Sequence, residues 1–466
     1  MARSWTPEQA ASLAPDAASL KAGQGLASPR KWTLLARDAH YLWGLAQGSG
    51  KEPYQVQIDL EEPAFKCSCP SRKFPCKHGL GLLLIHAASP AAVREGERPD
   101  WVNEWVAKRG ERAAKKEERA QKAAEDKPVD AAAQARRREK RESHIEAGVS
   151  FVEGWLADIV RQGIAALPSA GYAFWDGPAR RLVDAQAPGL ARLVRELGGY
   201  ATGRAGWEEP FTAALGRVHL LLAAWRRRAT LAPAWQAEID GLIGWTVDQD
   251  ELKQQPGLQR RWFAAAQQVR EEDRLVVRTT LVFSSEGEVA RVLEFSHATQ
   301  ASASALVAGR WFEAELVFFP GVASTRALVK GAPRDAEPTA LPMLEHVDDV
   351  LGGYAERVLE NPFAAELPVL VRLTPRYEQG RWLLADARGA ALPVSEPCAA
   401  GWEMLACSGG AAIGLCGLWN GFTFEPRSLV EEAGAFALVR RWPRFTKPCS
   451  SARRARPRRP RCPMPR

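Results

Sequence analysis

Three cysteines and one histidine lie within twelve residues near the start of the chain. They follow the pattern C-x-C, six residues, then C-x-H, and are Cys67, Cys69, Cys76 and His78. Zinc takes four sulfur or nitrogen ligands in a tetrahedral arrangement, and three thiolates with one imidazole leave no coordination position for water. The pattern therefore predicts a structural Zn²⁺ site. Reactive thiols are the alternative use of clustered cysteines.

The spacing within each ligand pair predicts the element that carries it. Side chains two residues apart in an extended chain point to the same side, so Cys67 and Cys69 at a strand end can face one ion. We expect Cys76 and His78 to come from the start of a short helix over residues 77–88. Apolar and β-branched residues upstream predict the strands that precede this helix, at residues 32–36, 40–46 and 54–60.

This pattern resembles the SWIM-type zinc finger, whose signature is C-x-C, a variable spacer and C-x-H on a strand-strand-helix unit. The Cys-Lys-His-Gly order at 76–79 and the apolar helix residues at 80–85 fit that unit. The resemblance implies zinc bound by the four ligands above, and a role in binding nucleic acid or protein instead of catalysis. The rest of the chain is similar to long bacterial proteins that carry this finger near the N-terminus.

Four basic side chains surround the predicted ligands, and they are candidates for contacting a partner. They are Lys66, Arg72, Lys73 and Lys77. Zn²⁺ with three thiolates and a neutral imidazole carries a net charge of −1, so nearby cations would stabilise the thiolates whether or not a phosphate docks. Two interpretations therefore stay open: contact with DNA or RNA, and simple compensation of the charge of the metal site.

Composition excludes several protein classes. The chain has 466 residues, 46% of them hydrophobic and 25% charged, which is typical of folded globular proteins, and its eight cysteines are too few for a disulfide-stapled domain. No run approaches the ~18 apolar residues of a membrane helix, and the first twenty residues lack a secretory signal, so we expect a cytoplasmic protein with no membrane partner.

The net charge of +8 is no evidence for nucleic-acid binding, because of its distribution. Eleven Lys and Arg residues and no acid lie in residues 440–466, and without them the net charge falls to −3. This Arg- and Pro-rich end lacks periodicity and is predicted to be disordered. It has two interpretations, a nucleic-acid tail or the product of a shifted reading frame, and no function is based on it.

Periodicity predicts an α+β multidomain protein with a small ββα zinc finger, a helical middle domain and an antiparallel β-rich C-terminal domain. Apolar residues recur at helical spacing after Ile145, and β-branched and aromatic residues alternate after Arg274. The predicted parts are residues 1–100 with the finger core at about 40–90, a charged linker at 101–144, a helical domain at 145–272, a β-rich α+β domain at 273–437 and the tail at 438–466.

Other residues with reactive side chains have ordinary structural interpretations. The acidic cluster Asp248, Asp250 and Glu251 could bind a divalent cation, but its position favours a solvated helix end. We expect His86 on the surface of the finger helix and no fifth ligand there. Three further cysteines, with no histidine nearby, suit small hydrophobic positions in strands or turns: Cys398, Cys407 and Cys416.

No recognisable catalytic residues and no small-molecule substrate are evident. Phosphate-binding loops, H-E-x-x-H zinc motifs and G-x-S-x-G nucleophile elbows are absent, so we expect no enzyme. Many tryptophans fall in residues 145–272, where core packing is favoured over a platform for stacking bases. Two alternatives to the interaction module remain: a protein-assembly scaffold whose C-terminal domains bind partner subunits, and an unrecognised enzyme with its site in residues 145–437.

Overall fold

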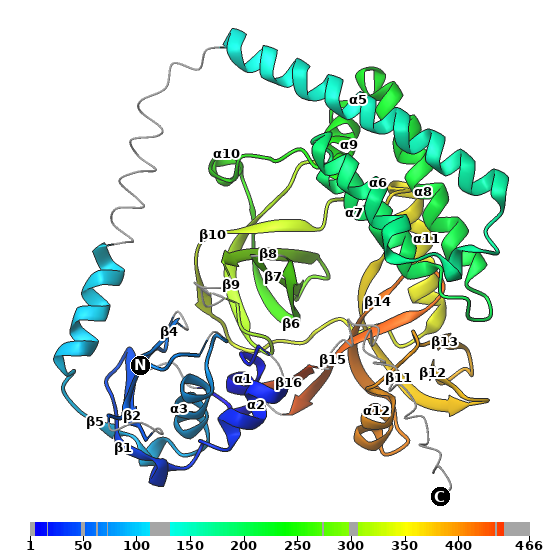
Figure 1. The fold of residues 1–466 in the computed structure, drawn as a ribbon. Helices are drawn as coiled ribbons and strands as arrows, with labels where there is room; N and C mark the ends of the chain where they lie inside the picture. The colour runs from blue at the N-terminus through cyan, green and yellow to red at the C-terminus, as the bar shows by residue number, and fades with distance from the viewer. Residues whose placement is uncertain are drawn as a thin grey trace, which may run out of the picture.

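The chain forms a central barrel with an N-terminal sheet unit, a helical bundle and a C-terminal sheet around it (Figure 1). The computed structural model describes most of residues 5–441; residues 112–130 of the predicted charged linker and the tail from residue 442 lie outside the described residues. The described ranges are 5–15, 17–47, 52–61, 64–71, 73–111, 131–272, 275–297, 306–433 and 436–441.

The N-terminal unit is a five-stranded sheet in the order β4-β3-β2-β1-β5, antiparallel except for the β1–β5 pair. Its strands are β1 (Trp32–Arg37), β2 (Tyr41–Ala46), β3 (Tyr54–Asp59), β4 (Ala64–Cys67) and β5 (Arg94–Glu95). Its helices are α1 (Pro7–Ser12), α2 (Ala17–Gln24) and α3 (Lys77–Ala88), with short 3-10 turns at Pro29–Lys31 and Pro90–Ala92. The predicted strands and finger helix are therefore present, β4 provides the strand end predicted for Cys67, and β5 is a further strand.

Both faces of this sheet are covered. The apolar residues of α3 fill the core on one face, together with Val56 and Ile58 of β3. Residues 100–111 form a further helix, in which Val102 packs with Trp43 of β2 on the other face. Residues 101–111 of the predicted linker at 101–144 are therefore part of the N-terminal unit. Apolar side chains such as Val102 give this helix a face to bury.

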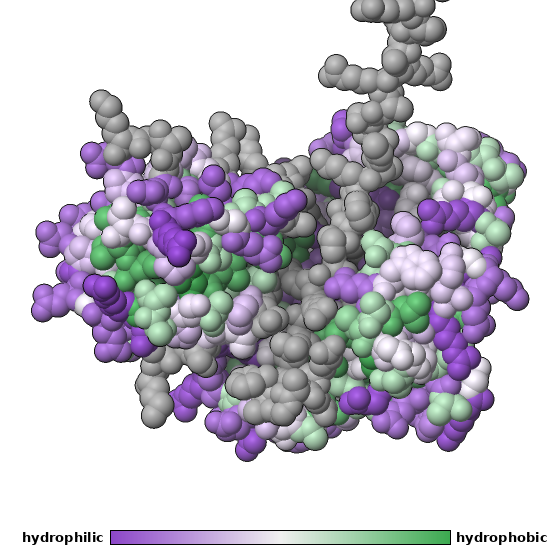
Figure 2. Space-filling view, turned by 90° about the horizontal axis from the view of Figure 1, so that it is seen from below, coloured by the Kyte–Doolittle hydropathy of each residue, from purple (hydrophilic) through white to green (hydrophobic). Residues whose placement is uncertain are grey.

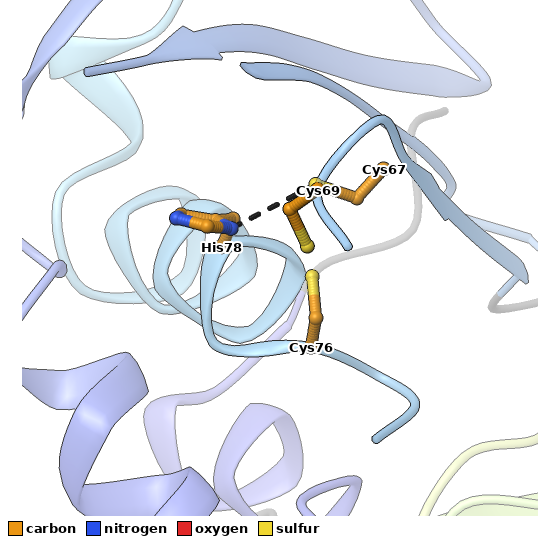
Figure 3. Close-up of side chains that lie close together, drawn as sticks. All are labelled: Cys67, Cys69, Cys76 and His78. Carbon is orange, nitrogen blue, oxygen red and sulfur yellow. Dashed lines mark hydrogen bonds between the residues drawn. The ribbon is translucent and has the colours of Figure 1, made fainter. Parts of the chain in front are cut away.

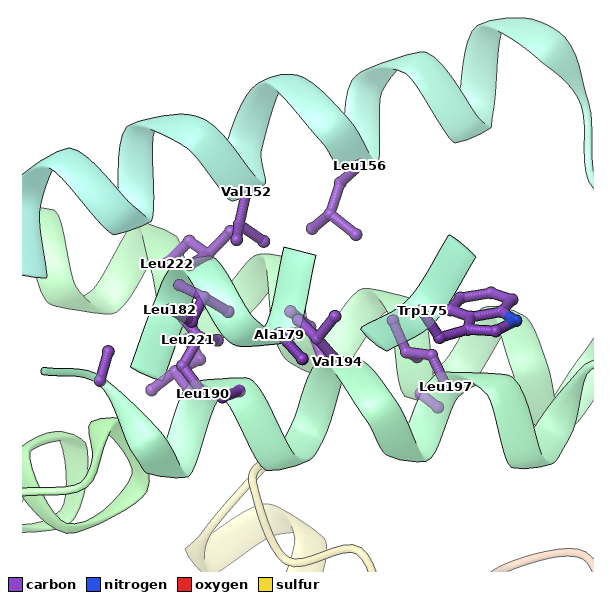
Figure 4. Packing of buried hydrophobic residues seen from close by; sticks show 14 of the residues in the cluster. Val152, Leu156, Trp175, Ala179, Leu182, Leu190, Val194, Leu197, Leu221 and Leu222 are labelled. Atoms are coloured by element: carbon purple, nitrogen blue, oxygen red, sulfur yellow. The ribbon is translucent and has the colours of Figure 1, made fainter. Parts of the chain in front are cut away.

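The middle of the chain is a helical bundle. Val152, Leu182, Val194 and Leu222 come from four helices and meet in one apolar core (Figure 4). The helices are α5 (Ala131–Gln162), α6 (Tyr172–Asp184), α7 (Pro188–Tyr200), α8 (Glu208–Arg227) and α9 (Pro233–Ile243), followed by the short α10 (Gln249–Gln254). Two 3-10 turns, Leu167–Ser169 and Arg228–Thr230, join them. Helix α5 begins inside the predicted linker and continues into the bundle.

A closed five-stranded barrel follows, in the order β10-β8-β7-β6-β9. All neighbours are antiparallel except β10 and β8, whose parallel pairing closes the barrel. The strands are β6 (Leu258–Glu272), β7 (Leu275–Ser284), β8 (Val289–His297), β9 (Trp311–Phe318) and β10 (Arg326–Asp335).

Strand β6 corrects the predicted helical domain at 145–272, because its residues are strand and not helix. Trp262 and Ala264 fill the barrel interior, whereas Phe263 and Ala265 pack outward against the C-terminal sheet. Since both faces of this segment are buried, its sequence lacks the polar alternation that marks a half-buried strand.

The last unit is a six-stranded sheet in the order β13-β12-β11-β14-β15-β16, with antiparallel neighbours throughout. Its strands are β11 (Leu367–Glu378), β12 (Arg381–Ala385), β13 (Ala391–Pro393), β14 (Ile413–Trp419), β15 (Phe424–Ala433) and β16 (Phe436–Arg441), and its helices are α11 (Val347–Glu360) and α12 (Gly401–Ser408). One expectation is corrected: residues 438–441 of the predicted tail belong to β16.

Arg310 links the N-terminal unit to the barrel. Arg310 is buried, and its guanidinium carbon lies 4.8 Å from the centre of the Trp5 ring. It donates to Gln9 Oε1 at 3.3 Å and pairs with Asp335 at 3.4 Å. Val307, just before it, belongs to the N-terminal core. The sheet unit and the barrel therefore pack through a specific contact.

The predicted fold class, α+β with a helical middle and a β-rich C-terminal region, is confirmed. The β-rich region comprises two units, a barrel and a sheet, where the sequence predicted one domain. Among the described residues, no helix has both the length and the apolar character needed to cross a membrane.

Candidate metal centre

The metal-ligand set is assembled from the end of one strand and the start of one helix. Cys67 is the last residue of β4, and Cys69 follows it by two residues. Cys76 is the N-cap of α3, and His78 lies in the first helical turn. Figure 3 shows the three sulfur atoms and the imidazole ring turned toward one another. The structure thus brings together all four residues that the sequence predicts.

The spacing of the four ligand atoms fits one metal ion. They all lie within 4.8 Å of one another, and Cys67 Sγ is 3.8 Å from His78 Nδ1. Ligand atoms around a tetrahedral zinc are separated by roughly 3.5–4 Å, so only small adjustments would close the site. Cys76 and His78 are buried and the other two are half-buried, which restricts access of water.

The pKa values of the three thiols differ because the thiols are buried close together and affect one another's ionisation. The Cys67 thiol and the His78 ring hold the pKa of Cys76 at about 4, against the opposing effect of burial. The same contact with Cys76, together with burial, raises the pKa of Cys67 above its usual range, and burial raises that of Cys69. One thiolate therefore forms readily, and ionising the other two requires a nearby positive charge such as a dication.

Aromatic side chains enclose the site, and sequence reasoning missed them. The Tyr54 ring lies 4.9 Å from the His78 ring, and Phe65 contacts Phe74 edge-on at 6.3 Å. A side chain at Gly79 would come within 2.9 Å of Phe65 Cδ1, which explains a glycine directly after the histidine. The aromatic residues flanking the motif were the available signal, since a structural metal needs a dry, shaped surround.

Three of the four predicted basic residues lie exposed around this site, and the fourth, Arg72, lies outside the described residues. Lys66 is on β4 between Phe65 and Cys67, Lys73 is in the loop before the helix, and Lys77 opens α3. Strand, loop and helix each contribute one exposed lysine close in sequence to the ligands.

The remaining candidates have structural roles. Asp248 caps α10 by accepting the amides of Asp250 at 2.8 Å and Glu251 at 3.2 Å, as the solvated-end interpretation predicted. His86 is buried, so its predicted surface position is wrong; residues 78–86 of α3 are all buried, and this part of the helix has no exposed face. Within the described part of the chain, the four ligands above form the only group of three or more residues suited to a metal.

The positions of the other cysteines and of the tryptophans are explained by packing within strands and helices. Cys416 is fully buried in β14, where burial raises its pKa to about 12. Cys407 lies in α12, so its predicted strand or turn position is wrong. Trp175 and Trp225 are part of the bundle core, which agrees with packing and leaves their faces unavailable to bases.

Comparisons with known proteins match two separate parts of the chain. Residues 54–86, which run from β3 to the end region of α3, match the family model described as SWIM zinc finger. Residues 140–243 match the SWIM-associated four-helix bundle domain, and they span most of α5 and all of α6 to α9. Neither the curated proteins nor the solved structures gave a match to this chain. The chain therefore carries a SWIM zinc finger near its N-terminus, followed by a SWIM-associated four-helix bundle domain.

Proposed function

We propose that this protein is a non-catalytic interaction protein whose SWIM finger is folded by a structural Zn²⁺ and binds the phosphate backbone of nucleic acid. The closed set of four ligands carries the non-catalytic part of the proposal. With Cys67, Cys69, Cys76 and His78 all directed at one point, no ligand position remains for a substrate or a water molecule.

Bound zinc would neutralise thiolate charge and link β4 to α3. The chain's own residues then shape the binding surface. Lys66 alternates with Phe65 and Cys67 on β4, so its side chain is exposed on the other face of the strand, next in sequence to a ligand. Lys73 and Lys77 are also exposed. The exposed ammonium groups of Lys66 and Lys77 give two positive charges against a metal site of net charge −1, an excess that favours phosphate oxygens.

The lysine surface is tested on the full-length, zinc-loaded protein. The variant Lys66→Gln/Lys77→Gln removes two ammonium groups without touching a metal ligand, and Lys253→Gln on α10 is a control with an exposed lysine. We expect wild type to bind DNA or RNA with a strong dependence on salt, and the double variant to reduce the salt slope by about two. Equal slopes for the double variant and the control would contradict nucleic-acid binding by this surface.

A scaffold that binds partner subunits through the C-terminal sheet is the second candidate. Trp402 of α12 is 64% exposed, and its ring lies 5.2 Å from that of Tyr377 on β11, which is 46% exposed. Figure 2 shows hydrophobic areas among hydrophilic ones on the face formed by the N-terminal unit and the C-terminal sheet. Exposed tryptophan and tyrosine are the side chains most enriched at protein interfaces.

The scaffold candidate is tested by quantitative affinity purification from the native host. Trp402→Ala is compared with Tyr172→Ala, which removes another exposed aromatic ring, on α6. A subunit that is lost only with Trp402→Ala supports the scaffold, and Cys67→Ser then shows whether the finger is required. Identical partners for both variants and wild type would contradict the scaffold.

Either role suits a reducing compartment, and we propose the cytoplasm because clustered thiols there persist as metal ligands.

A further inference from the structure

Arginines from three units converge where the bundle, the barrel and the C-terminal sheet meet. Strand pairing places Arg326 of β10 directly beside Arg291 of β8, so both side chains project from the same face of the barrel wall. Arg192 lies near enough to Arg326 to repel it, as Arg291 does with Arg357. The five members of this arginine cluster are Arg192 on α7, Arg217 on α8, Arg291 on β8, Arg326 on β10 and Arg357 on α11.

Three of the carboxylates at this junction already have partners, and a fourth, Glu360, exerts an attractive charge on Arg357. Glu366 pairs with Arg291 at 3.1 Å, and Glu196 lies 3.8 Å from Arg192 on the same helix. Glu238 accepts from the side-chain amide of Asn361 at 2.9 Å and from the backbone of Val322 at 3.1 Å. Within the described residues, none of the three other arginines of the cluster forms an ion pair: Arg217, Arg326 and Arg357.

The junction has more hydrogen-bond donors than acceptors. Arg357 donates one Nη to the carbonyl of Ala323 at 3.3 Å, but its buried Nε has no acceptor among the described residues. The buried Nε of Arg291 has none there either. Burial and neighbouring guanidinium groups hold the pKa of Arg326 and of Arg357 below the usual range. The buried Nε atoms of Arg291 and Arg357 are costly to leave without an acceptor, and an anion could supply one.

Neighbouring aromatic side chains help to order the cluster before any ligand arrives. The guanidinium carbon of Arg326 lies 4.0 Å from the centre of the Phe319 ring, which orients its donors. Arg217 lies beside Tyr200 and Tyr354, and Tyr354 is itself held by a 3.1 Å hydrogen bond to the carbonyl of Asn420. A preformed arrangement loses less conformational entropy on binding.

We propose that the arginine cluster at the junction of bundle, barrel and C-terminal sheet binds a phosphate group, carried by a small phosphorylated ligand or by a nucleic-acid backbone. Arg217 on α8, Arg326 on β10 and Arg357 on α11 present more hydrogen-bond donors than the two oxygens of a carboxylate can accept. A phosphate offers additional oxygens for bidentate contacts. This site is separate from the finger and does not depend on its zinc.

The test uses the full-length, zinc-loaded protein and two probes, pyrophosphate and a short single-stranded oligodeoxynucleotide. Arg326→Gln removes one guanidinium group from the cluster, and Arg334→Gln makes the same change on an exposed side chain of the same strand. Binding is measured by titration calorimetry, and the thermal transition of each variant verifies folding. We expect Arg326→Gln to weaken binding of at least one probe by about tenfold, and Arg334→Gln to leave it unchanged.

The two probes identify the source of the phosphate. Dependence on Arg326 for pyrophosphate supports a small phosphorylated ligand, and dependence for the oligonucleotide alone supports a nucleic-acid backbone. Combining Arg326→Gln with Lys66→Gln/Lys77→Gln separates the cluster from the finger, because loss caused only by the lysine changes belongs to the finger. Absence of binding by wild type, or equal affinities for Arg326→Gln and Arg334→Gln, would overturn the proposal.

Discussion

His78 Nδ1 lies 3.8 Å from Cys67 Sγ, although one residue belongs to the first turn of helix α3 and the other ends strand β4. The ten residues between them form a loop whose ends are joined at the ligand atoms. A metal ion at this point acts as a cross-link between strand and helix, so its binding free energy stabilises the fold of the whole finger.

Chelation of zinc is expected to unfold the finger and leave the helical bundle folded. Without the ion, the adjacent thiols and imidazole lose the charge that holds them together, and β4 and the start of α3 separate. Hydrogen exchange before and after chelation measures this, with α3 amides losing protection and those of α8 retaining it. Full protection of α3 after verified loss of zinc would show that the apolar core alone maintains this unit.

Two neighbouring leucines of α8 test the bundle core. Leu222 is fully buried, whereas Leu220 is 41% exposed on the opposite side of the same helix. Leu222→Ala should lower the free energy of unfolding of the bundle by about 2–5 kcal/mol, because it removes apolar contacts and leaves a cavity. Leu220→Ala should change it by less than about 0.5 kcal/mol. Urea unfolding followed by tryptophan fluorescence compares them, and equal losses would contradict the packing.

The hydrogen bonds to the Asp386 carboxylate predict that the C-terminal sheet loses stability at acidic pH. Backbone amides of Val347, Arg388 and Ala390 donate to it at 2.9–3.0 Å, and these bonds hold its pKa below the usual range. Because the folded-state pKa is lowered, the stabilisation is present above the unfolded pKa of ~3.9 and is lost as pH falls through the folded-state value.

The matched variant for this carboxylate is Asp386→Asn, which keeps the shape and removes the charge. Thermal unfolding from neutral pH down to pH ~2 should show a smaller loss of stability on acidification for the variant than for wild type. Parallel pH profiles for the two proteins would exclude a contribution from this residue.

The finger was predictable because its information is local. The spacing of Cys67, Cys69, Cys76 and His78 determines both the ligand set and the strand-to-helix arrangement, and the structure reproduces each of these elements. The aromatic enclosure by Tyr54 and Phe65 depends on strand pairing, which no local pattern specifies.

The barrel was not predictable in the same way. Strand β6 has side chains buried on both faces, with Trp262 inside and Phe263 outside, so its alanine-rich sequence resembles a helix. Closure of the barrel depends on the parallel contact of β10 with β8, which are distant in sequence. The arginine cluster is likewise formed only by tertiary contact, since Arg192 and Arg326 belong to separate units.

Elemental analysis of the full-length protein, purified under reductant, tests the central claim most directly. The account predicts one zinc ion per chain for wild type and for Cys398→Ser, which changes a half-buried cysteine outside the site, and loss of that ion for Cys76→Ser. Wild-type protein without stoichiometric zinc, or Cys76→Ser with the same content as wild type, would contradict it.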